Sequence, residues 1–256
     1  MRICKFIFAS FFSLIAFSKT SDAQPVSRFS YEKYVEKNDT LLYRQLYPDN
    51  VQGKKYPLVI FLHGAGERGN DNEAQLKWGI ANLASDEQMK LHPAIVVAPQ
   101  CPAGDRWSNF TGYNNGNMKL ESAPSKPMKL VIGLIQKMMK SMPVDPDRIY
   151  ITGLSMGGFG TFDLLARYPD LFAAAVPVCG GGDEATASVF SRVPVWIFHG
   201  AEDPTVNPDY SVKMADALKR TGAKPGLTLY PDTGHFSWIA AYSEPLMWEW
   251  MFRQRK

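Results

Sequence analysis

Six residues at positions 153–158, Gly-Leu-Ser-Met-Gly-Gly, constrain this chain more than any other stretch. They follow a short apolar run at 148–152 that is typical of a buried strand, and they precede a run at 159–168 with helical spacing. A strand that reverses abruptly into a helix leaves room only for small side chains beside the turn, which explains the glycines. The serine is then strained, with its hydroxyl exposed at the positive end of the helix. In this setting G-x-S-x-G predicts that Ser155 is a nucleophile.

Strand-like and helix-like stretches alternate from residue 56 to the end of the chain. The run at 56–62, Tyr-Pro-Leu-Val-Ile-Phe-Leu, is apolar throughout, as expected of a strand covered on both faces. Two earlier strands, at 31–35 and 41–47, are expected to form an antiparallel pair. The expected helices lie at 72–83, 127–142, 159–168, 183–190, 208–221 and from 237 onward. The pattern predicts one α/β domain with a mostly parallel sheet, helices on both faces and antiparallel N-terminal strands.

The first 23 residues have the pattern of a signal peptide. A basic start precedes an apolar run at 6–17, and Ser21-Asp22-Ala23 supplies the small residues of a cleavage site. The apolar run is shorter than the roughly 20 residues of a membrane-spanning helix. We therefore expect no stable membrane anchor, cleavage after Ala23, export to the periplasm or the exterior, and a single catalytic domain at 24–256.

The charge balance excludes strongly electrostatic partners. Cleavage of 23 from 256 residues leaves 233, enough for one large domain. Loss of Arg2, Lys5, Lys19 and Asp22 leaves 25 basic and 24 acidic side chains. This balance gives no attraction for nucleic acid or an anionic membrane and favours a neutral or small substrate.

Two cysteines remain after cleavage, Cys101 and Cys179. In the expected sheet, two strands lie between the strands that these residues follow, a separation of roughly 14 Å. That distance is beyond disulfide reach. We predict two buried or half-buried free thiols.

The loop at 63–69, His-Gly-Ala-Gly-Glu-Arg-Gly, has two interpretations. Its Gly-x-Gly-x-x-Gly spacing is that of a dinucleotide-binding loop, which also needs an acidic residue at the end of the next strand. That strand, at 94–98, is followed by Pro99 and Gln100, so no nucleotide cofactor is expected. In the other interpretation, His-Gly-x-Gly aims a backbone N–H at the oxyanion of a tetrahedral intermediate. No metal site is predicted, because metal-ligand spacings of His and Cys are missing.

A serine nucleophile needs a base, and the chain has four histidines. His92 precedes its strand and His63 belongs to the loop above, which leaves His199 and His235. His199 lacks a well-placed acid between itself and Ser155, so we interpret it as a hydrogen-bonded histidine at a strand end. His235 follows the last expected strand, at 227–230, and is predicted to be the base.

The acid of the triad should lie between nucleophile and base in the chain. Asp203 directly follows the strand at 193–198 and its His-Gly-Ala-Glu extension, and Pro204 fixes the backbone after it. Its neighbour Glu202 is the alternative acid. We predict Asp203, because it sits at the turn.

The order of Ser155, Asp203 and His235 resembles that of the α/β-hydrolase superfamily. With the motifs at 62–66, 153–158, 199–203 and 234–235, the chain is similar to its phospholipase/carboxylesterase and dienelactone-hydrolase-like branch, which includes feruloyl and acetyl-xylan esterases. The resemblance covers residues 56–240. It implies an α/β-hydrolase fold and oxyanion donors from the backbone N–H groups of Ala65 and Met156.

Aromatic residues that follow strands are the expected substrate contacts. These are Trp107 and Phe110 in the irregular stretch 99–124, and Trp238 after the last strand. Trp78 lies in a run with helical spacing and is expected in the core.

The sequence therefore predicts a secreted serine carboxylesterase that acts on small-molecule or polysaccharide-linked esters, including acyl and feruloyl esters, without a cofactor. A lysophospholipase-like or a prolyl-oligopeptidase-like hydrolase is the alternative enzyme. An inactive hydrolase-fold binding module is an alternative of another class. The sequence leaves the oligomeric state and the ester specificity open.

Overall fold

The computed structural model describes residues 25–49, 54–113 and 116–256. The predicted signal peptide at 1–23 lies outside these residues, so cleavage and export stay predictions. Within the described part of the chain, every helix is too short or too polar to span a lipid bilayer.

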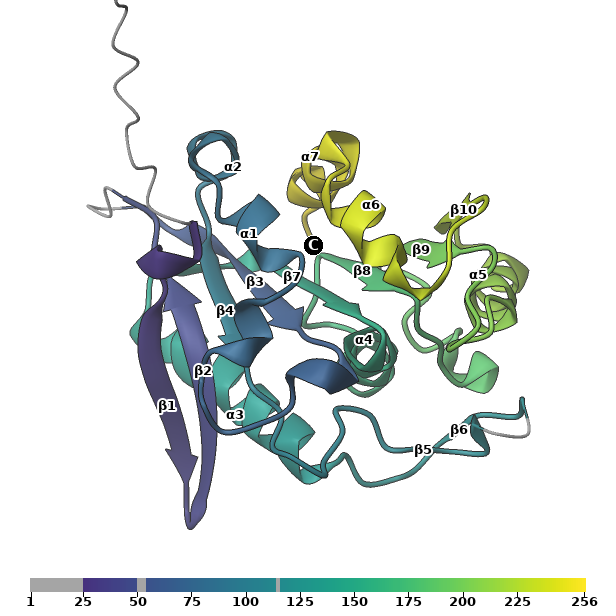
Figure 1. The fold of residues 1–256 in the computed structure, drawn as a ribbon, viewed down its shortest axis with the longest axis horizontal. Helices are drawn as coiled ribbons and strands as arrows, with labels where there is room; N and C mark the ends of the chain where they lie inside the picture. Colours follow the sequence, from purple (N-terminus) through teal and green to yellow (C-terminus); the bar gives the residue numbers. More distant parts are fainter. Residues whose placement is uncertain (1–24, 50–53, 114–115) are drawn as a thin grey trace, which may run out of the picture.

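The centre of the fold is an eight-stranded sheet in the order β1-β2-β4-β3-β7-β8-β9-β10 (Figure 1). β1 pairs antiparallel with β2, and β2 with β4, whereas the other neighbouring pairs are parallel. The prediction of a mostly parallel sheet with an antiparallel start is confirmed. The strands are β1 (Ser30–Glu36), β2 (Asp39–Leu46), β3 (Tyr56–Leu62), β4 (Ile95–Pro99), β7 (Val144–Leu154), β8 (Ala174–Val178), β9 (Trp196–Gly200) and β10 (Gly226–Tyr230), with a separate hairpin of β5 (Phe110–Thr111) and β6 (Lys119–Leu120).

Helices cover both faces of the sheet and divide its apolar side chains into two cores. Along β3, Leu58, Ile60 and Leu62 join one core, whereas Val59 and Phe61 join the other. The first core is closed by α3 (Lys126–Ser141), α4 (Met156–Arg167) and α5 (Asp209–Arg220), and the second by α1 (Ile80–Leu83), α2 (Asp86–Leu91), α6 (Trp238–Tyr242) and α7 (Pro245–Arg253). Each fully buried Leu, Ile, Val or Phe side chain stabilises the folded chain by about 2 kcal/mol of transfer free energy.

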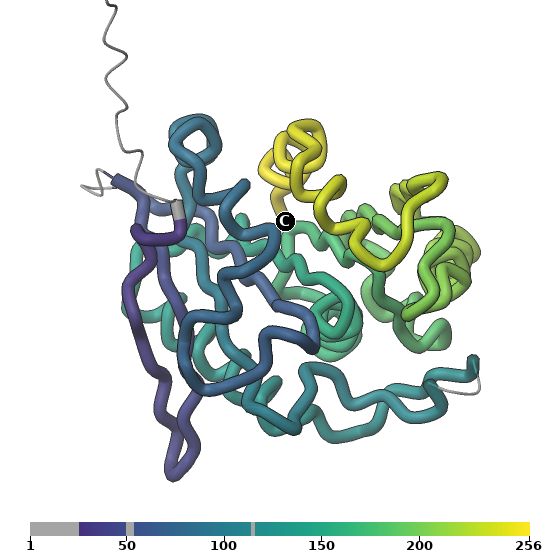
Figure 2. Tube along the Cα trace, in the orientation of Figure 1, coloured from purple at the N-terminus to yellow at the C-terminus, as the bar shows by residue number. Residues whose placement is uncertain are grey.

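On the second face, segments far apart in the sequence meet. Figure 2 shows α1 beside the C-terminal α6. The expected single helix at 72–83 is wrong, because it is divided into a short 3₁₀ turn, η3 (Ala74–Leu76), and α1. Gly79 between them has φ of 73°, and a Cβ there would lie 2.4 Å from the Tyr242 ring. Packing of the C-terminal segment therefore overrides the helical spacing.

The other short 3₁₀ turns are η1 (Pro25–Arg28), η2 (Ala65–Glu67), η5 (Glu184–Thr186) and η6 (His235–Ser237). The helix expected at 183–190 is reduced to η5 and turns, and α2 was not predicted. Two of these turns, η2 and η6, carry the loops that approach Ser155.

The turn between β7 and α4 is as tight as the sequence predicts. Ser155 has φ of 52° and ψ of −115°, a strained conformation for a residue with a side chain. A Cβ on Gly157 would lie 1.9 Å from the Leu62 carbonyl oxygen, and one on Gly158 would lie 2.5 Å from that of Val178. The glycines are therefore required by the backbones of the neighbouring strands β3 and β8.

A methyl group at Gly157 should disrupt this turn. We expect Gly157→Ala to lower the free energy of unfolding by at least about 3 kcal/mol, because the atom that it meets belongs to the backbone and must be displaced. Gly66→Ala is the matched control, since nothing lies within 4 Å of its added Cβ, and it should change stability by less than about 1 kcal/mol. Urea denaturation measures both values. Equal effects of the two substitutions would contradict the packing account of the turn.

Candidate active site

Three side chains from separate loops form a continuous hydrogen-bonded chain. The Ser155 Oγ lies 2.9 Å from His235 Nε2, and His235 Nδ1 lies 2.7 Å from Asp203 Oδ2. Ser155 opens α4, Asp203 follows β9 and His235 follows β10, all at the carboxyl edge of the sheet. The structure thus brings together the three predicted residues, with the imidazole between hydroxyl and carboxylate. Both Ser155 and His235 are partly exposed, so a substrate can reach them.

The Asp203 carboxylate is buried and held on both oxygens. Its Oδ1 accepts hydrogen bonds from the amides of Thr205 and Val206, at 2.8 and 2.9 Å. Burial acts to raise the pKa of Asp203, but the hydrogen bonds with His235 and with these two amides outweigh it, so the pKa lies below its usual value. Asp203 is therefore ionised at neutral pH. Its neighbour Glu202, the alternative acid, is exposed.

His199 touches the same carboxylate from the other side. Its Nε2 lies 3.2 Å from Asp203 Oδ2 and 3.0 Å from the Val206 carbonyl, and its Nδ1 lies 2.6 Å from Ser211 Oγ. Two acceptors face Nε2, so that nitrogen carries the proton and Nδ1 accepts from Ser211. Burial lowers the pKa of His199 and keeps it neutral. The prediction of a hydrogen-bonded histidine fits, but its contact with Asp203 was missed; the i, i+4 spacing is the available signal.

The predicted oxyanion donors belong to two elements, the start of α4 and the loop after β3. Met156 is the first residue of α4, and amides at this position lack an acceptor within the helix. Ala65 begins η2, next to Gly64, whose added Cβ would lie 2.8 Å from the Leu154 side chain. The loop after β3 therefore packs against the residue that precedes Ser155, as an oxyanion loop requires.

His63 holds this loop in place through buried hydrogen bonds. It is 1% exposed; its Nε2 accepts from the Cys101 amide at 2.9 Å, and its Nδ1 donates to the Gly64 carbonyl at 2.6 Å. The indole N–H of Trp107 donates to the His63 carbonyl at 3.0 Å. Burial lowers the pKa of His63 to about 4, so the ring is neutral near pH 7.

Glu67 secures the other end of the loop. It is 6% exposed, and a Cβ added at Gly64 would lie 3.0 Å from its carboxyl oxygen, so the Glu67 side chain packs against the start of the loop. Burial raises the pKa of Glu67, and the charge of Lys77 and the polar groups of Gly64 and Trp78 oppose this rise without cancelling it. Sequence reasoning missed Glu67, although a glutamate three residues after the start of a helical turn is the spacing of a capping box.

The predicted substrate contacts need correction. Trp107 is 0% exposed and Phe110 is 7% exposed, and both belong to the core below α4 rather than to an open cleft. Trp238 is 5% exposed, with its ring edge-on to His235 at 5.1 Å between centroids. The exposed aromatic side chain here is Phe236, and Trp78 is only partly buried. Trp107 turns inward because its indole N–H donates to the His63 carbonyl.

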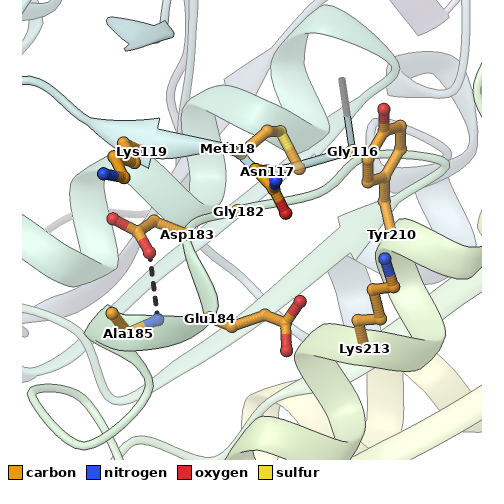
Figure 3. A pocket seen from close by; sticks show the side chains of 10 residues that line it. All are labelled: Gly116, Asn117, Met118, Lys119, Gly182, Asp183, Glu184, Ala185, Tyr210 and Lys213. Atoms are coloured by element: carbon orange, nitrogen blue, oxygen red, sulfur yellow. Dashed lines mark hydrogen bonds between the residues drawn. The ribbon is translucent and has the colours of Figure 1, made fainter. Parts of the chain in front are cut away.

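A separate hollow of about 330 Å³ lies between the β5–β6 hairpin and the segment after β8 (Figure 3). It is lined by Gly116, Asn117, Met118, Lys119, Gly182, Asp183, Glu184, Ala185, Tyr210 and Lys213. Ser155, Asp203 and His235 are not among these residues. Asp183 is already used, since its two oxygens accept from the amides of Leu120 and Ala185. This hollow therefore does not contain the three residues of the predicted triad.

One group of side chains has the composition of a metal site. Ligand atoms of Cys179, Asp203 and His235 lie within 4.8 Å of one another. Burial raises the pKa of the Cys179 thiol, however, so it stays protonated, whereas a metal binds the thiolate. The hydrogen bond between Asp203 and His235 accounts for the other two groups. Cys179 and Cys101 are both buried and free, as predicted.

The fold and the site together define the class of protein. A strained serine directly follows a central strand, and a histidine links it to an aspartate at the carboxyl edge of the parallel sheet. This is the arrangement of an α/β-hydrolase. The chain belongs to the phospholipase/carboxylesterase family, whose model matches residues 49–242. The predicted family is confirmed.

Comparisons with individual proteins agree with this family. The chain is 31% identical over 136 residues to a poly(3-hydroxyalkanoate) depolymerase C of Paucimonas lemoignei, covering 53% of this chain and 30% of the relative. It is 28% identical over 152 residues to a bifunctional acetylxylan esterase/xylanase of Neocallimastix patriciarum, covering 59% of this chain and 20% of the relative. A solved thermostable esterase superposes with a TM-score of 0.84 at 36% identity, covering 91% of this chain and 64% of that one. The chain thus spans a third or less of these two curated relatives.

The buried His63 predicts a specific pH dependence of stability. Its pKa of about 4 in the folded chain lies below the value of about 6.5 in an unfolded chain. Between these values the unfolded chain binds the proton and the folded chain does not, so stability is complete above pH 6.5 and falls toward pH 4. We expect about 2 kcal/mol to be lost from pH 7 to pH 5 through this residue. Urea denaturation of wild type and His63→Gln at both pH values measures it, and an equal loss in both proteins would contradict the assignment.

Proposed function

We propose that this protein is a serine carboxylesterase that hydrolyses carboxylic esters through an acyl-enzyme on Ser155. The observation that carries the proposal is the unbroken contact from Ser155 Oγ through His235 to the ionised Asp203. An isolated serine is a weak nucleophile, and a neighbouring imidazole held by a carboxylate activates it.

In the first half of the reaction, Ser155 Oγ attacks the ester carbonyl carbon while His235 Nε2 takes the hydroxyl proton. The carbonyl oxygen becomes an oxyanion, which the amides of Ala65 and Met156 stabilise. The intermediate collapses when the bond to the alcohol oxygen breaks, and His235 gives its proton to that oxygen. Asp203 stabilises the imidazolium and holds Nδ1–H in place.

In the second half, water replaces the alcohol. His235 takes a proton from the water, whose oxygen attacks the acyl carbon on Ser155. Collapse of the second tetrahedral intermediate releases the carboxylic acid, and the proton returns from His235 to Ser155 Oγ. Each half-reaction balances without a metal or a redox cofactor as a participant.

For the substrate we propose acyl esters linked to polysaccharides, including acetyl and feruloyl esters. Support comes from the acetylxylan esterase/xylanase among the relatives and from the near-neutral charge of the predicted mature chain. Export by the signal peptide at 1–23 is part of this proposal, because a polysaccharide substrate lies outside the cell.

Substitution of Asp203, compared with substitution of its neighbour Glu202, tests which of the two is the acid of the triad. We expect Asp203→Asn to lower kcat for p-nitrophenyl acetate about 10⁴-fold, because the amide favours the wrong tautomer of His235. Glu202→Gln, the matched control, removes an exposed carboxylate one residue away and should leave kcat within about twofold of wild type. Near-normal kcat in Asp203→Asn, or a large loss in Glu202→Gln, would overturn the assignment. Hydrolysis of a peptidyl anilide faster than of the ester would favour a peptidase instead.

A further inference from the structure

Three aromatic side chains form a connected group beside the catalytic histidine. The Phe236 ring lies 4.7 Å from that of Trp238 and 5.9 Å from that of Trp78, and the two indoles lie 6.2 Å apart. We call Trp78, Phe236 and Trp238 the aromatic wall. Trp238 is buried against His235, whereas Phe236 is 56% exposed. The aromatic wall is therefore buried at Trp238 and exposed at Phe236.

The wall connects the two loops that carry the reaction. At one end, the Trp78 side chain favours the ionised form of the buried Glu67 carboxyl, and that carboxyl packs against Gly64 in the loop after β3. At the other end, Phe236 directly follows His235 within η6. Phe236 is thus an exposed ring next to His235 in the chain, held by ring contacts with Trp78 and Trp238.

The geometry of the tetrahedral intermediate determines which part of a substrate meets this wall. The reacting carbon carries Ser155 Oγ, the oxyanion, the alcohol oxygen and the acyl chain. The oxyanion must face the Ala65 and Met156 amides, and the alcohol oxygen must face His235 Nε2 to receive its proton. The alcohol therefore leaves on the side of His235, beside Phe236 and Trp78.

The acyl chain has the remaining direction, away from His235. Elsewhere, Tyr113, Phe159 and Tyr210 form a second aromatic group, with centroids 5.4 Å apart for Tyr113 and Phe159 and 5.5 Å for Tyr113 and Tyr210. Phe159 lies one helical turn after Ser155 in α4. The two aromatic groups thus come from different elements.

We propose that the aromatic wall is the binding site for the alcohol half of the ester and selects alcohols that carry a ring with an apolar face. This inference rests on the proposed esterase function and adds the group that leaves. An aryl ring or a sugar ring covers the exposed face of Phe236 and gains stacking contacts, whereas a short linear alcohol covers little of it. Selection acts on kcat/KM, because the alcohol has departed before deacylation begins.

The test uses acetate esters that share one acyl group. For wild type, Phe236→Ala and Phe236→Tyr, kcat/KM is measured with benzyl acetate, a mono-acetylated methyl xyloside and ethyl acetate. We expect the benzyl-to-ethyl ratio to fall about tenfold in Phe236→Ala and to be retained in Phe236→Tyr, which keeps the ring. An equal fall for the xyloside extends the site to sugars, and a fall for benzyl acetate alone limits it to aryl alcohols.

Two controls separate this site from general damage. Leu246→Ala removes a side chain that is 63% exposed on α7, outside the aromatic wall, and should leave every ratio unchanged. The ratio of ethyl butanoate to ethyl acetate, which varies only the acyl group, should change less than twofold in Phe236→Ala. An unchanged benzyl-to-ethyl ratio, or a change confined to the acyl series, would overturn the inference while leaving the esterase function intact. Wild type that hydrolyses none of the esters would overturn both.

Discussion

The contact between the end of β3 and the turn after Ser155 is the constraint on which the site depends. The Leu62 carbonyl occupies the space where a side chain on Gly157 would lie, so β3 and α4 approach as closely as two backbones can. In the turn that makes this approach, Ser155 has a strained backbone with φ of 52° and ψ of −115°. It also brings the loop of His63, Gly64 and Ala65 beside the serine, since that loop continues directly from β3. One packing contact therefore places both the proposed nucleophile and a predicted oxyanion donor.

Buried electrostatics complete the arrangement. The Asp203 carboxylate is out of contact with bulk water but receives two amide N–H groups and faces two imidazoles, His235 and His199. An ionised carboxylate can be buried only with such partners. Because burial keeps His199 neutral, it donates a hydrogen bond without adding a charge that would compete with the imidazolium form of His235. The predicted oxyanion loop is also supported by buried titratable residues. His63 is neutral at the start of the loop, and Glu67 is buried at its other end.

Much of this was predictable because it depends on local constraints. Apolar runs and glycine positions identified the strands and the turn at Ser155, and residues that follow strands must meet at one edge of a parallel sheet. The relation of Asp203 to His235 followed from that rule. Contacts between distant segments were not predictable: Tyr242 packs on Gly79 and breaks the expected helix at 72–83, and Trp107 turns inward to bind the His63 carbonyl. A sequence shows that an aromatic residue follows a strand, but not which face it occupies.

Covalent capture of Ser155 tests the proposed mechanism most directly. The tryptic fragment 149–167 contains Ser155 as its sole serine, together with Tyr150, Thr152 and Thr161, so tandem mass spectrometry of this peptide identifies which hydroxyl is modified. After incubation with a fluorophosphonate, the wild-type fragment should carry the phosphonyl adduct. His235→Ala should label far more slowly, because no base remains to take the proton. An unmodified fragment 149–167 in folded wild type, or an adduct elsewhere in the chain in its place, would contradict a nucleophilic Ser155.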